Sequence, residues 1–300
     1  VTIGAASMTG KPYNDVFGLP LPDFIRSACP HYWKFGNEGE SEEDFSLRMA
    51  QDLEDVIAKE GADTIAGFFA EPVMGAGGVI PPSKNYFQFI QPILKKHNIP
   101  LIADEVICGF GRTGKLFGCE TYGMEPDLLT FAKAVTNGFQ PLGGVMVSEK
   151  VAEVITGDGG EFGHGFTYSG HPIACAAALA TMDIMENGNF IQRVADDIGP
   201  YLQRQWTALG NHPIVGHVRG AGMLGSIELV RDKESRERLE PEQKSGGICR
   251  EFCVANGLIM RAVGDSMIIS PPFVSTHEEI DLLIARATKS LDQTAEHYSV

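Results

Sequence analysis

The stretch IPLIADEVI, residues 99–107, decides the fold class of this chain. It is a short apolar run with two acidic residues near its end, and such a run predicts a buried strand. Three more runs predict strands: TIAGFFA at 64–70, PDLLTFAKAV at 126–135 and GGVMVS at 143–148. Amphipathic helices are predicted between them. This alternation is typical of an α/β fold, with a mainly parallel sheet that helices cover on both faces.

Helix end signals place the main helices around these strands. Ser41 begins a capped amphipathic helix that Gly61 ends. A second amphipathic helix is predicted over residues 83–97. A third is predicted over residues 172–187, because proline suits the first turn of a helix and the sequence NGN stops it.

The pattern of predicted strands and helices changes after residue 190. Strand-like pieces at 214–220 and 223–230 mix there with helices, the last of which Thr276 caps. A length of 300 residues also favours about two domains. We therefore expect a large domain over residues 1–189 and a smaller C-terminal α+β domain over residues 190–300.

The composition excludes several classes of protein. The chain has 300 residues, 24 basic and 39 acidic side chains and a net charge of −15, which argues against nucleic acid and anionic membranes as partners. No apolar run is long enough to span a bilayer. Six cysteines without a CxxC pair predict free thiols in a reducing compartment, the cytoplasm. The histidines lack metal-ligand spacing, so no metal site is expected.

Three predicted strands each end in an ionisable group. Glu71 follows the first, Asp104 lies in the second and Lys133 lies in the third. Any one of them reads most simply as a solvated strand end or a local salt bridge. Ligands of such sheets bind at the carboxyl ends of the strands, so the three together predict a common polar pocket.

The residue types in this pocket suit one kind of ligand. Strand alternation puts Asp104 and Val106 on one face, with Glu105 pointing away. A carboxylate beside a branched apolar side chain suits a flat heteroaromatic ring with a protonated nitrogen. Lys133 is expected in an apolar strand end, where desolvation lowers the pKa of an amine and makes it a nucleophile. This is the set that pyridoxal phosphate chemistry needs.

Four motifs carry a family resemblance. DEVICGFGRTG (104–114), MEPDLLTFAKAV (124–135), PLGGVMVS (141–148) and HGFTYSGHP (164–172) resemble the class III aminotransferases, which have the pyridoxal-phosphate-dependent transferase fold type I. The resemblance covers essentially the whole chain. It implies pyridoxal 5'-phosphate as the cofactor.

The resemblance also implies roles for single residues. Lys133 would bind the cofactor covalently and then move the substrate proton, and Asp104 would keep the ring nitrogen protonated. Val106 would pack on one ring face, and Glu71 would neighbour the cofactor. Thr167 would reach across a dimer interface to the partner's cofactor phosphate. The alternative for Thr167 is a turn residue that caps the following helix.

The segment EPVMGAGG at 71–78 resembles one subgroup of the class III aminotransferases more than the others. Ornithine and 4-aminobutyrate aminotransferases have a glutamate where this chain has Ala76, and that glutamate pairs with an active-site arginine. Amine:pyruvate transaminases, the omega-transaminases, have a small residue there and a free arginine, which matches Arg261. Arg261 would grip the carboxylate of pyruvate or alanine bidentately and swing out for a hydrophobic amine. The alternative is an ordinary surface arginine.

These points predict an aminotransferase that passes an amino group from a primary amine to a keto acid, pyruvate, in two half-reactions. A homodimer or dimer of dimers with shared active sites is implied. The alternatives are an aminomutase or decarboxylase on the same scaffold, and a cofactor-free binding homologue. Family members carry a longer N-terminal portion with part of the phosphate site, and this chain, which opens without Met, is expected to lack it.

The chain contains a match to a dinucleotide-binding motif that we do not interpret as a binding site. The sequence GAGMLG at 220–225 matches GxGxxG, but that fingerprint needs a helix after it. The residues that follow, SIELV, predict a strand. We therefore interpret these glycines as turn residues rather than a nicotinamide site.

Overall fold

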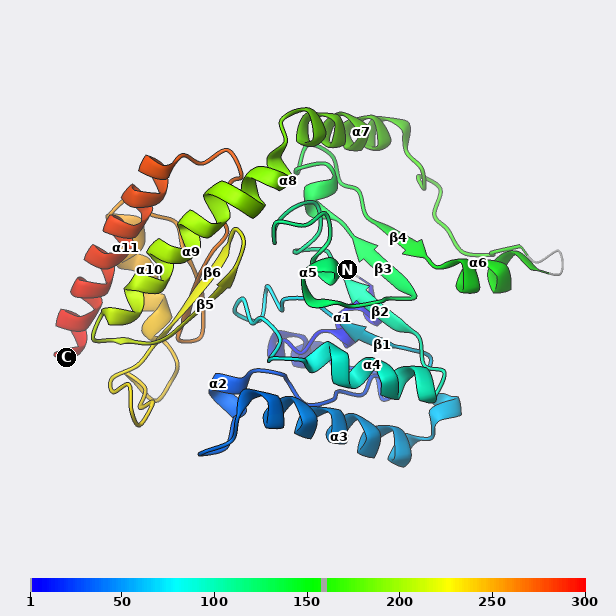
Figure 1. Ribbon diagram of the computed structural model, residues 1–300, viewed down its shortest axis with the longest axis horizontal. Coiled ribbons are helices and arrows are strands. Elements are labelled where there is room, and N and C mark those ends of the chain that lie inside the picture. Colours follow the sequence, from blue (N-terminus) through cyan, green and yellow to red (C-terminus); the bar gives the residue numbers. More distant parts are fainter. Residues whose placement is uncertain (1, 158–160) are drawn as a thin grey trace.

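The computed structural model describes residues 2–157 and 161–300 (Figure 1). Its first sheet has the order β1-β2-β3-β4. The strands are β1 (Phe68–Ala70), β2 (Leu101–Asp104), β3 (Leu128–Phe131) and β4 (Gly144–Val147). β1, β2 and β3 run parallel, and β4 is antiparallel to β3. The mainly parallel sheet predicted from the sequence is thus confirmed, and the carboxyl ends of its three parallel strands lie at one edge.

Two long helices pack against this sheet and form its core. They are α3 (Glu42–Glu60) and α4 (Tyr86–Lys96), which supply the fully buried Phe45 and Ile90. The predicted cap of α3 is confirmed, because the Ser41 side chain accepts from the N–H three residues on. Gly61 ends this helix at a φ of +90°.

The other helices of this half are mostly short. They are α1 (Ile3–Met8), α2 (Tyr32–Phe35), α5 (Gly118–Tyr122), α6 (Glu149–Thr156), α7 (Pro172–Asn187) and α8 (Phe190–Arg193). The predicted bounds of α7 are confirmed. None of the helices in the described residues is long and apolar enough to cross a membrane.

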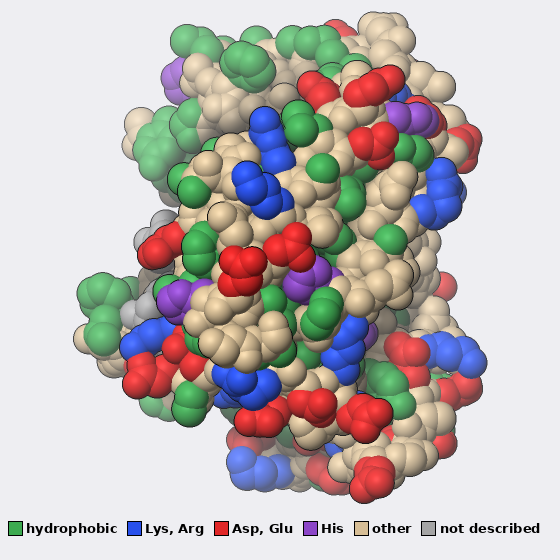
Figure 2. Space-filling model, turned by 90° about the vertical axis from the view of Figure 1, so that its left-hand side faces the viewer, with side chains coloured by type: hydrophobic (Ala, Val, Ile, Leu, Met, Phe, Trp, Pro, Cys, Tyr) green, Lys and Arg blue, Asp and Glu red, His purple; other side chains and the backbone are tan. Residues whose placement is uncertain are grey.

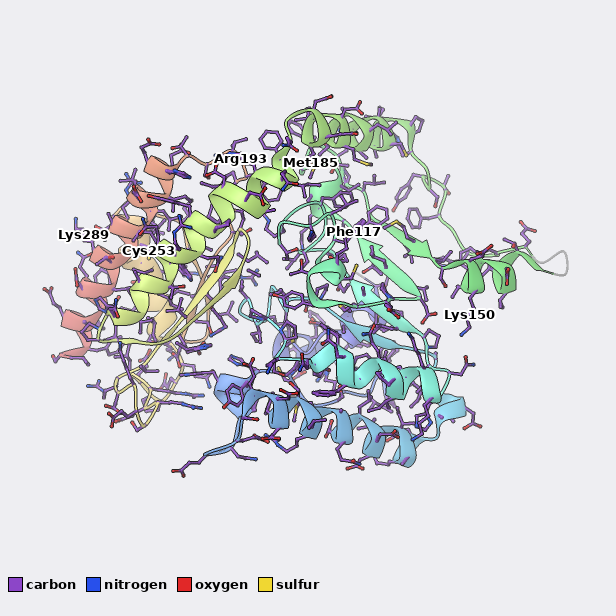
Figure 3. The ribbon with its side chains drawn as sticks, viewed as in Figure 1. Phe117, Lys150, Met185, Arg193, Cys253 and Lys289 are labelled. Carbon is purple, nitrogen blue, oxygen red and sulfur yellow. The ribbon has the colours of Figure 1, made fainter. Side chains whose placement is uncertain are left out.

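A second sheet lies toward the C-terminus, at the left of Figure 1. It is antiparallel, with the order β5-β6-β8-β7, from β5 (Val215–Ala221), β6 (Leu224–Leu229), β7 (Arg261–Val263) and β8 (Ser266–Ile269). A π-helical turn (Val194–Ile198) leads into α9 (Gly199–Ala208), and α10 (Ser245–Ala255) and α11 (His277–Tyr298) follow. These helices enclose a core with the fully buried Trp206 and Cys253, the latter labelled on α10 in Figure 3.

Two further predictions are confirmed in this half. Thr276 caps α11, since it accepts from the N–H of Glu279 while the Glu279 carboxylate accepts from the N–H of Thr276. The GAGMLG segment forms the turn between β5 and β6, where Ala221 pairs with Leu224. The domain boundary at residue 190 falls between α7 and α8 and stays a prediction.

The predicted strands were too long, and the sheet is less covered than expected. β1 begins only at Phe68 because residues 62–64 form a 3-10 turn, and β2 ends at Asp104 rather than at residue 107. Coverage on both faces is wrong for β4, where Val145, Met146 and Val147 are 57%, 42% and 41% exposed. An edge strand has a neighbour on one side only, and in the described residues no helix covers these side chains.

Candidate active site

Asp104 is the last residue of β2, and a local turn fixes its carboxylate. Its Oδ1 accepts from the N–H of Val106 over 3.0 Å, and Thr130 Oγ1 on β3 donates to the same oxygen over 3.4 Å. The prediction that strand alternation pairs Asp104 with Val106 is wrong, because the strand has already ended. An Asx turn, in which an aspartate binds the backbone two residues on, keeps Val106 beside it instead.

Glu105 points away from this edge, as predicted, and has a structural partner that the sequence analysis missed. It is 1% exposed, and its carboxylate accepts from the N–H groups of Gly118 over 2.9 Å and Cys119 over 2.6 Å. Burial raises the pKa of Glu105, and the two N–H donors oppose that rise. The sequence signal was available, because a carboxylate inside an apolar run needs a buried partner.

Lys133 lies just beyond β3 in a strained backbone conformation. Its φ is +50°, which a residue with a side chain rarely adopts, and it begins a 3-10 turn anchored by the buried Val135. The expected apolar surroundings are wrong, since the Lys133 side chain is exposed. β3 ends at Phe131 and Lys133 begins the following 3-10 turn, so Lys133 lies beyond the carboxyl end of the strand.

Glu71 brings the three strand-end groups together. Its pKa is raised to about 7, because burial and the charge of Asp104 raise it more than the Gly75 N–H bond and the charges of Lys133 and Lys11 lower it. The Gly75 N–H donates to Glu71 Oε2 over 2.9 Å. Glu71 follows β1, Asp104 ends β2 and Lys133 follows β3, and these three strands are parallel neighbours, so the three groups lie at one edge of the sheet.

The loop after Glu71 carries Ala76 and meets a cation that sequence reasoning missed. Lys11 Nζ donates to the carbonyl oxygen of Ala76. Burial lowers the pKa of Lys11, the charge of Arg261 lowers it further, and the charge of Glu71 raises it. Arg261 itself is exposed and begins β7. Lys11 therefore contacts the loop that carries Ala76, although it comes from a loop-like segment with no pattern to single it out.

Thr167 lies in the exposed turn before α7. The hydrogen bonds of this turn join Phe166 and Ser169, whose side chain accepts from the Phe166 N–H over 3.1 Å. The alternative reading of Thr167 as a helix cap is wrong, because His171 occupies the N-cap of α7 and no side chain caps that end.

Comparisons with known proteins agree on a family. The model of the family "Aminotransferase class-III" matches residues 1–291. The chain is 48% identical over 296 residues to the putrescine–pyruvate aminotransferase of Pseudomonas aeruginosa, covering 98% of this chain and 64% of the relative. It is 46% identical over 297 residues to gamma aminobutyrate transaminase 3, chloroplastic, of Solanum lycopersicum, covering 98% of this chain and 57% of the relative.

Solved structures agree with the sequence relatives. An omega-transferase from Vibrio fluvialis has a TM-score of 0.95 and 46% identity, covering 100% of this chain and 71% of that one. An omega-aminotransferase from Paracoccus denitrificans has a TM-score of 0.94 and 46% identity, covering 99% and 67%. The chain thus spans about three fifths of the length of the curated relatives that it matches. With fold type I and this match over nearly all its residues, the chain belongs to the class III aminotransferase family.

Proposed function

We propose that the protein is a pyridoxal-phosphate-dependent aminotransferase, which moves an amino group from a primary amine or ω-amino acid to pyruvate in two half-reactions. The observation that carries this proposal is the placement of Glu71, Asp104 and Lys133 at the carboxyl ends of three neighbouring parallel strands. In the first half-reaction the amine leaves as an aldehyde or ketone. In the second, pyruvate takes up the nitrogen and leaves as alanine.

The donor set at this edge fits the cofactor. Asp104 offers a carboxylate that is partly exposed and fixed through one oxygen, which suits a protonated ring nitrogen. Val106, beside it, offers an apolar surface for the ring, and the amine of Lys133 is exposed. When bound, the cofactor draws electrons away from the substrate carbon that carries nitrogen.

Two residues do most of the chemical work in this proposal. Asp104 would accept a hydrogen bond from the ring N–H and so keep that nitrogen protonated. Lys133 would hold the cofactor covalently through Nζ. As a free amine, Lys133 would take up and release the proton of the substrate carbon. Glu71 stays near the ring as a partly buried carboxyl group.

The substrate carboxylate is assigned to the opening around Ala76. The methyl group of Ala76 leaves room there, and Arg261 carries the fork of N–H donors that matches a carboxylate. Arg261 is exposed at the start of β7, so it is free to turn inward for pyruvate and outward for a hydrophobic amine.

We further propose a homodimer or a dimer of dimers, in which Thr167 reaches the cofactor phosphate of the partner subunit. The exposed apolar side chains of β4 and α7, among them Val145, Leu179 and Ile184, support an interface on this side of the large domain. The six free cysteines support a reducing compartment, and we propose the cytoplasm.

An absorbance spectrum of the full-length protein, loaded with cofactor, tests the proposal. We expect a visible band that bleaches when an amine is added and returns with pyruvate. A band that no amine bleaches would indicate an aminomutase or decarboxylase. A protein that acquires no band would be a binding homologue without the chemistry.

A panel of amines with pyruvate as acceptor then identifies the donor. Putrescine and 4-aminobutyrate belong in it because the relatives' names include both kinds of substrate. The two differ in charge at the end remote from the reacting amine. The free Arg261 predicts that a donor with an uncharged or apolar end is accepted as well.

A further inference from the structure

Arg219 on β5 is a buried arginine that the catalytic proposal does not use. It is 8% exposed, and each of its side-chain nitrogens donates a hydrogen bond. Nε donates to the carbonyl of Val79 over 3.0 Å, and Nη2 donates to the carbonyl of Gly78 over 3.0 Å and to Ser266 Oγ over 3.1 Å. Nη1 forms an ion pair with Glu228 at 2.9 Å.

These partners belong to two different parts of the molecule. Gly78 and Val79 end the loop that follows β1 and carries Ala76. Glu228 lies on β6, and Ser266 begins β8, which pairs with the strand that begins at Arg261. One guanidinium therefore joins the Ala76 loop to the pair of strands that carries Arg261.

The end of the Ala76 loop that Arg219 binds has a strained backbone. Val79 has a φ of +49°, which is unusual for a β-branched residue, and it is 2% exposed. Gly78 has a φ of +130°, and a Cβ placed there would lie 3.3 Å from Arg219 Nη2. Strained backbone persists only where its surroundings fix it, and the Arg219 bonds to two successive carbonyl groups do so here.

The rest of the loop is held by charged side chains as well. Glu71 accepts from the N–H of Gly75, and Lys11 donates to the carbonyl of Ala76. A bridge between Met74 and Ile80 closes the loop. Ala76 thus lies between one fixed point at Glu71 and another at Arg219, so its position relative to Arg261 depends on the Arg219 contacts.

We propose that Arg219 is a positioning residue that fixes the Ala76 loop relative to Arg261 and so sets the width of the opening for the acceptor carboxylate. This inference rests on the proposed function. Arg219 acts through the loop backbone and Ser266 rather than by touching the substrate. A small displacement of a positioned group costs much of the binding and rate that depend on its geometry.

The test is Arg219→Lys in the full-length protein, which keeps the charge but loses the forked set of donors. We expect the KM for pyruvate to rise about 10-fold or more while the KM for an uncharged amine stays within about 2-fold. The visible cofactor band should be unchanged. Hydrogen exchange in the peptide over residues 74–80 should become faster.

Arg231→Lys is the matched control. Arg231 Nη2 also donates to two carbonyl groups, those of Leu239 and Tyr298, over 3.2 and 3.4 Å, but both belong to the C-terminal half. Exchange over residues 74–80 and the KM for pyruvate should stay at their original values in this variant.

Two results would overturn the inference: unchanged exchange in this peptide, or an equal rise of both KM values. If Arg219→Lys does not fold, Ser266→Ala removes one partner of the same guanidinium, and it should produce the same pattern with smaller changes. A parent protein that does not use pyruvate would refute the proposed function. The exchange measurement would still decide whether Arg219 holds the loop.

Discussion

Lys133 has a left-handed backbone at the end of β3, and its side chain makes no contribution to a buried core. Lys133→Ala should therefore change the stability little. It should reduce the rate of transamination by about 10³-fold or more, because the nucleophile and the proton carrier are lost together. Steady-state rates and thermal unfolding measure the two effects.

Lys150→Ala is the control for this prediction. Lys150 is an exposed lysine on α6 (Figure 3), and it donates only to the side chain of Asn98 in the described part of the chain. Its replacement should leave the rate unchanged. If Lys133→Ala keeps its steady-state activity, the assignment of the nucleophile is wrong.

The Glu71 carboxyl should make the stability of the protein depend on pH near neutrality. Its pKa is about 7 in the folded chain and 4.5 ordinarily, so between these values the folded chain holds a proton that the unfolded chain has released. This contribution is complete below pH 4.5 and is lost as the pH rises through 7, with a slope of up to about 1.4 kcal/mol per pH unit. Glu71→Gln, which stays neutral, should remove that slope.

Urea unfolding at several pH values between 4.5 and 8 measures this difference. Glu251→Gln, the same change at an exposed position on α10, provides the control. Parallel curves for the parent protein and Glu71→Gln would show that Glu71 is not the group that titrates.

Arg261 should discriminate between the two substrates. Arg261 is exposed in the free chain, and turning inward onto a bound carboxylate would bury the contact. Loss of a buried bidentate contact costs on the order of 2–5 kcal/mol, so Arg261→Ala should raise the KM for pyruvate strongly and that for an arylalkyl amine little. Kinetics with each substrate varied in turn measure the two constants. Arg261→Lys keeps the charge without the forked set of donors, so its KM for pyruvate should lie between those of the parent protein and Arg261→Ala. Equal losses for both substrates would mean that Arg261 does not recognise the carboxylate.

Helix ends were the part of the elements that sequence predicted best. Ser41, Gly61 and Thr276 mark real ends because caps depend on residues within one helical turn. Strand ends depend on distant partners, so residue 104 as the end of β2 was not visible in an apolar run that continues to residue 107. For the same reason the sequence did not reveal Lys11 and Arg219. Their partners Ala76 and Val79 lie 65 and 140 positions away along the chain.

The buried Glu105 should matter for the stability of α5 more than a surface glutamate does. Glu105→Ala leaves two buried N–H groups without an acceptor, which should lower the free energy of unfolding by roughly 2–4 kcal/mol. Glu120→Ala on the same helix is the control. Within the described residues, Glu120 accepts from the exposed N–H of Phe117 alone, so its loss should cost about 1 kcal/mol or less. Similar costs in denaturant unfolding would contradict the anchoring role of Glu105.

At the scale of the whole molecule, apolar side chains gather on surfaces that a single chain leaves open. Figure 2 shows hydrophobic side chains along the top of the molecule, where Figure 1 has α7. Ile173, Leu179 and Ile184 of this helix are 61–63% exposed. In the proposed dimer, a second copy of the chain would cover α7 together with the turn that carries Thr167.

Mixing two inactive variants tests whether Thr167 serves the partner's site. In a dimer of one Lys133→Ala and one Thr167→Val subunit, one site would combine an intact Lys133 with the intact Thr167 of the other subunit. Random pairing should then restore about a quarter of the original activity, because half of the dimers are mixed and each has one complete site. If Thr167 acts within its own subunit, no site in the mixture is complete and no activity returns. Each variant alone, carried through the same dissociation and reassembly, is the control.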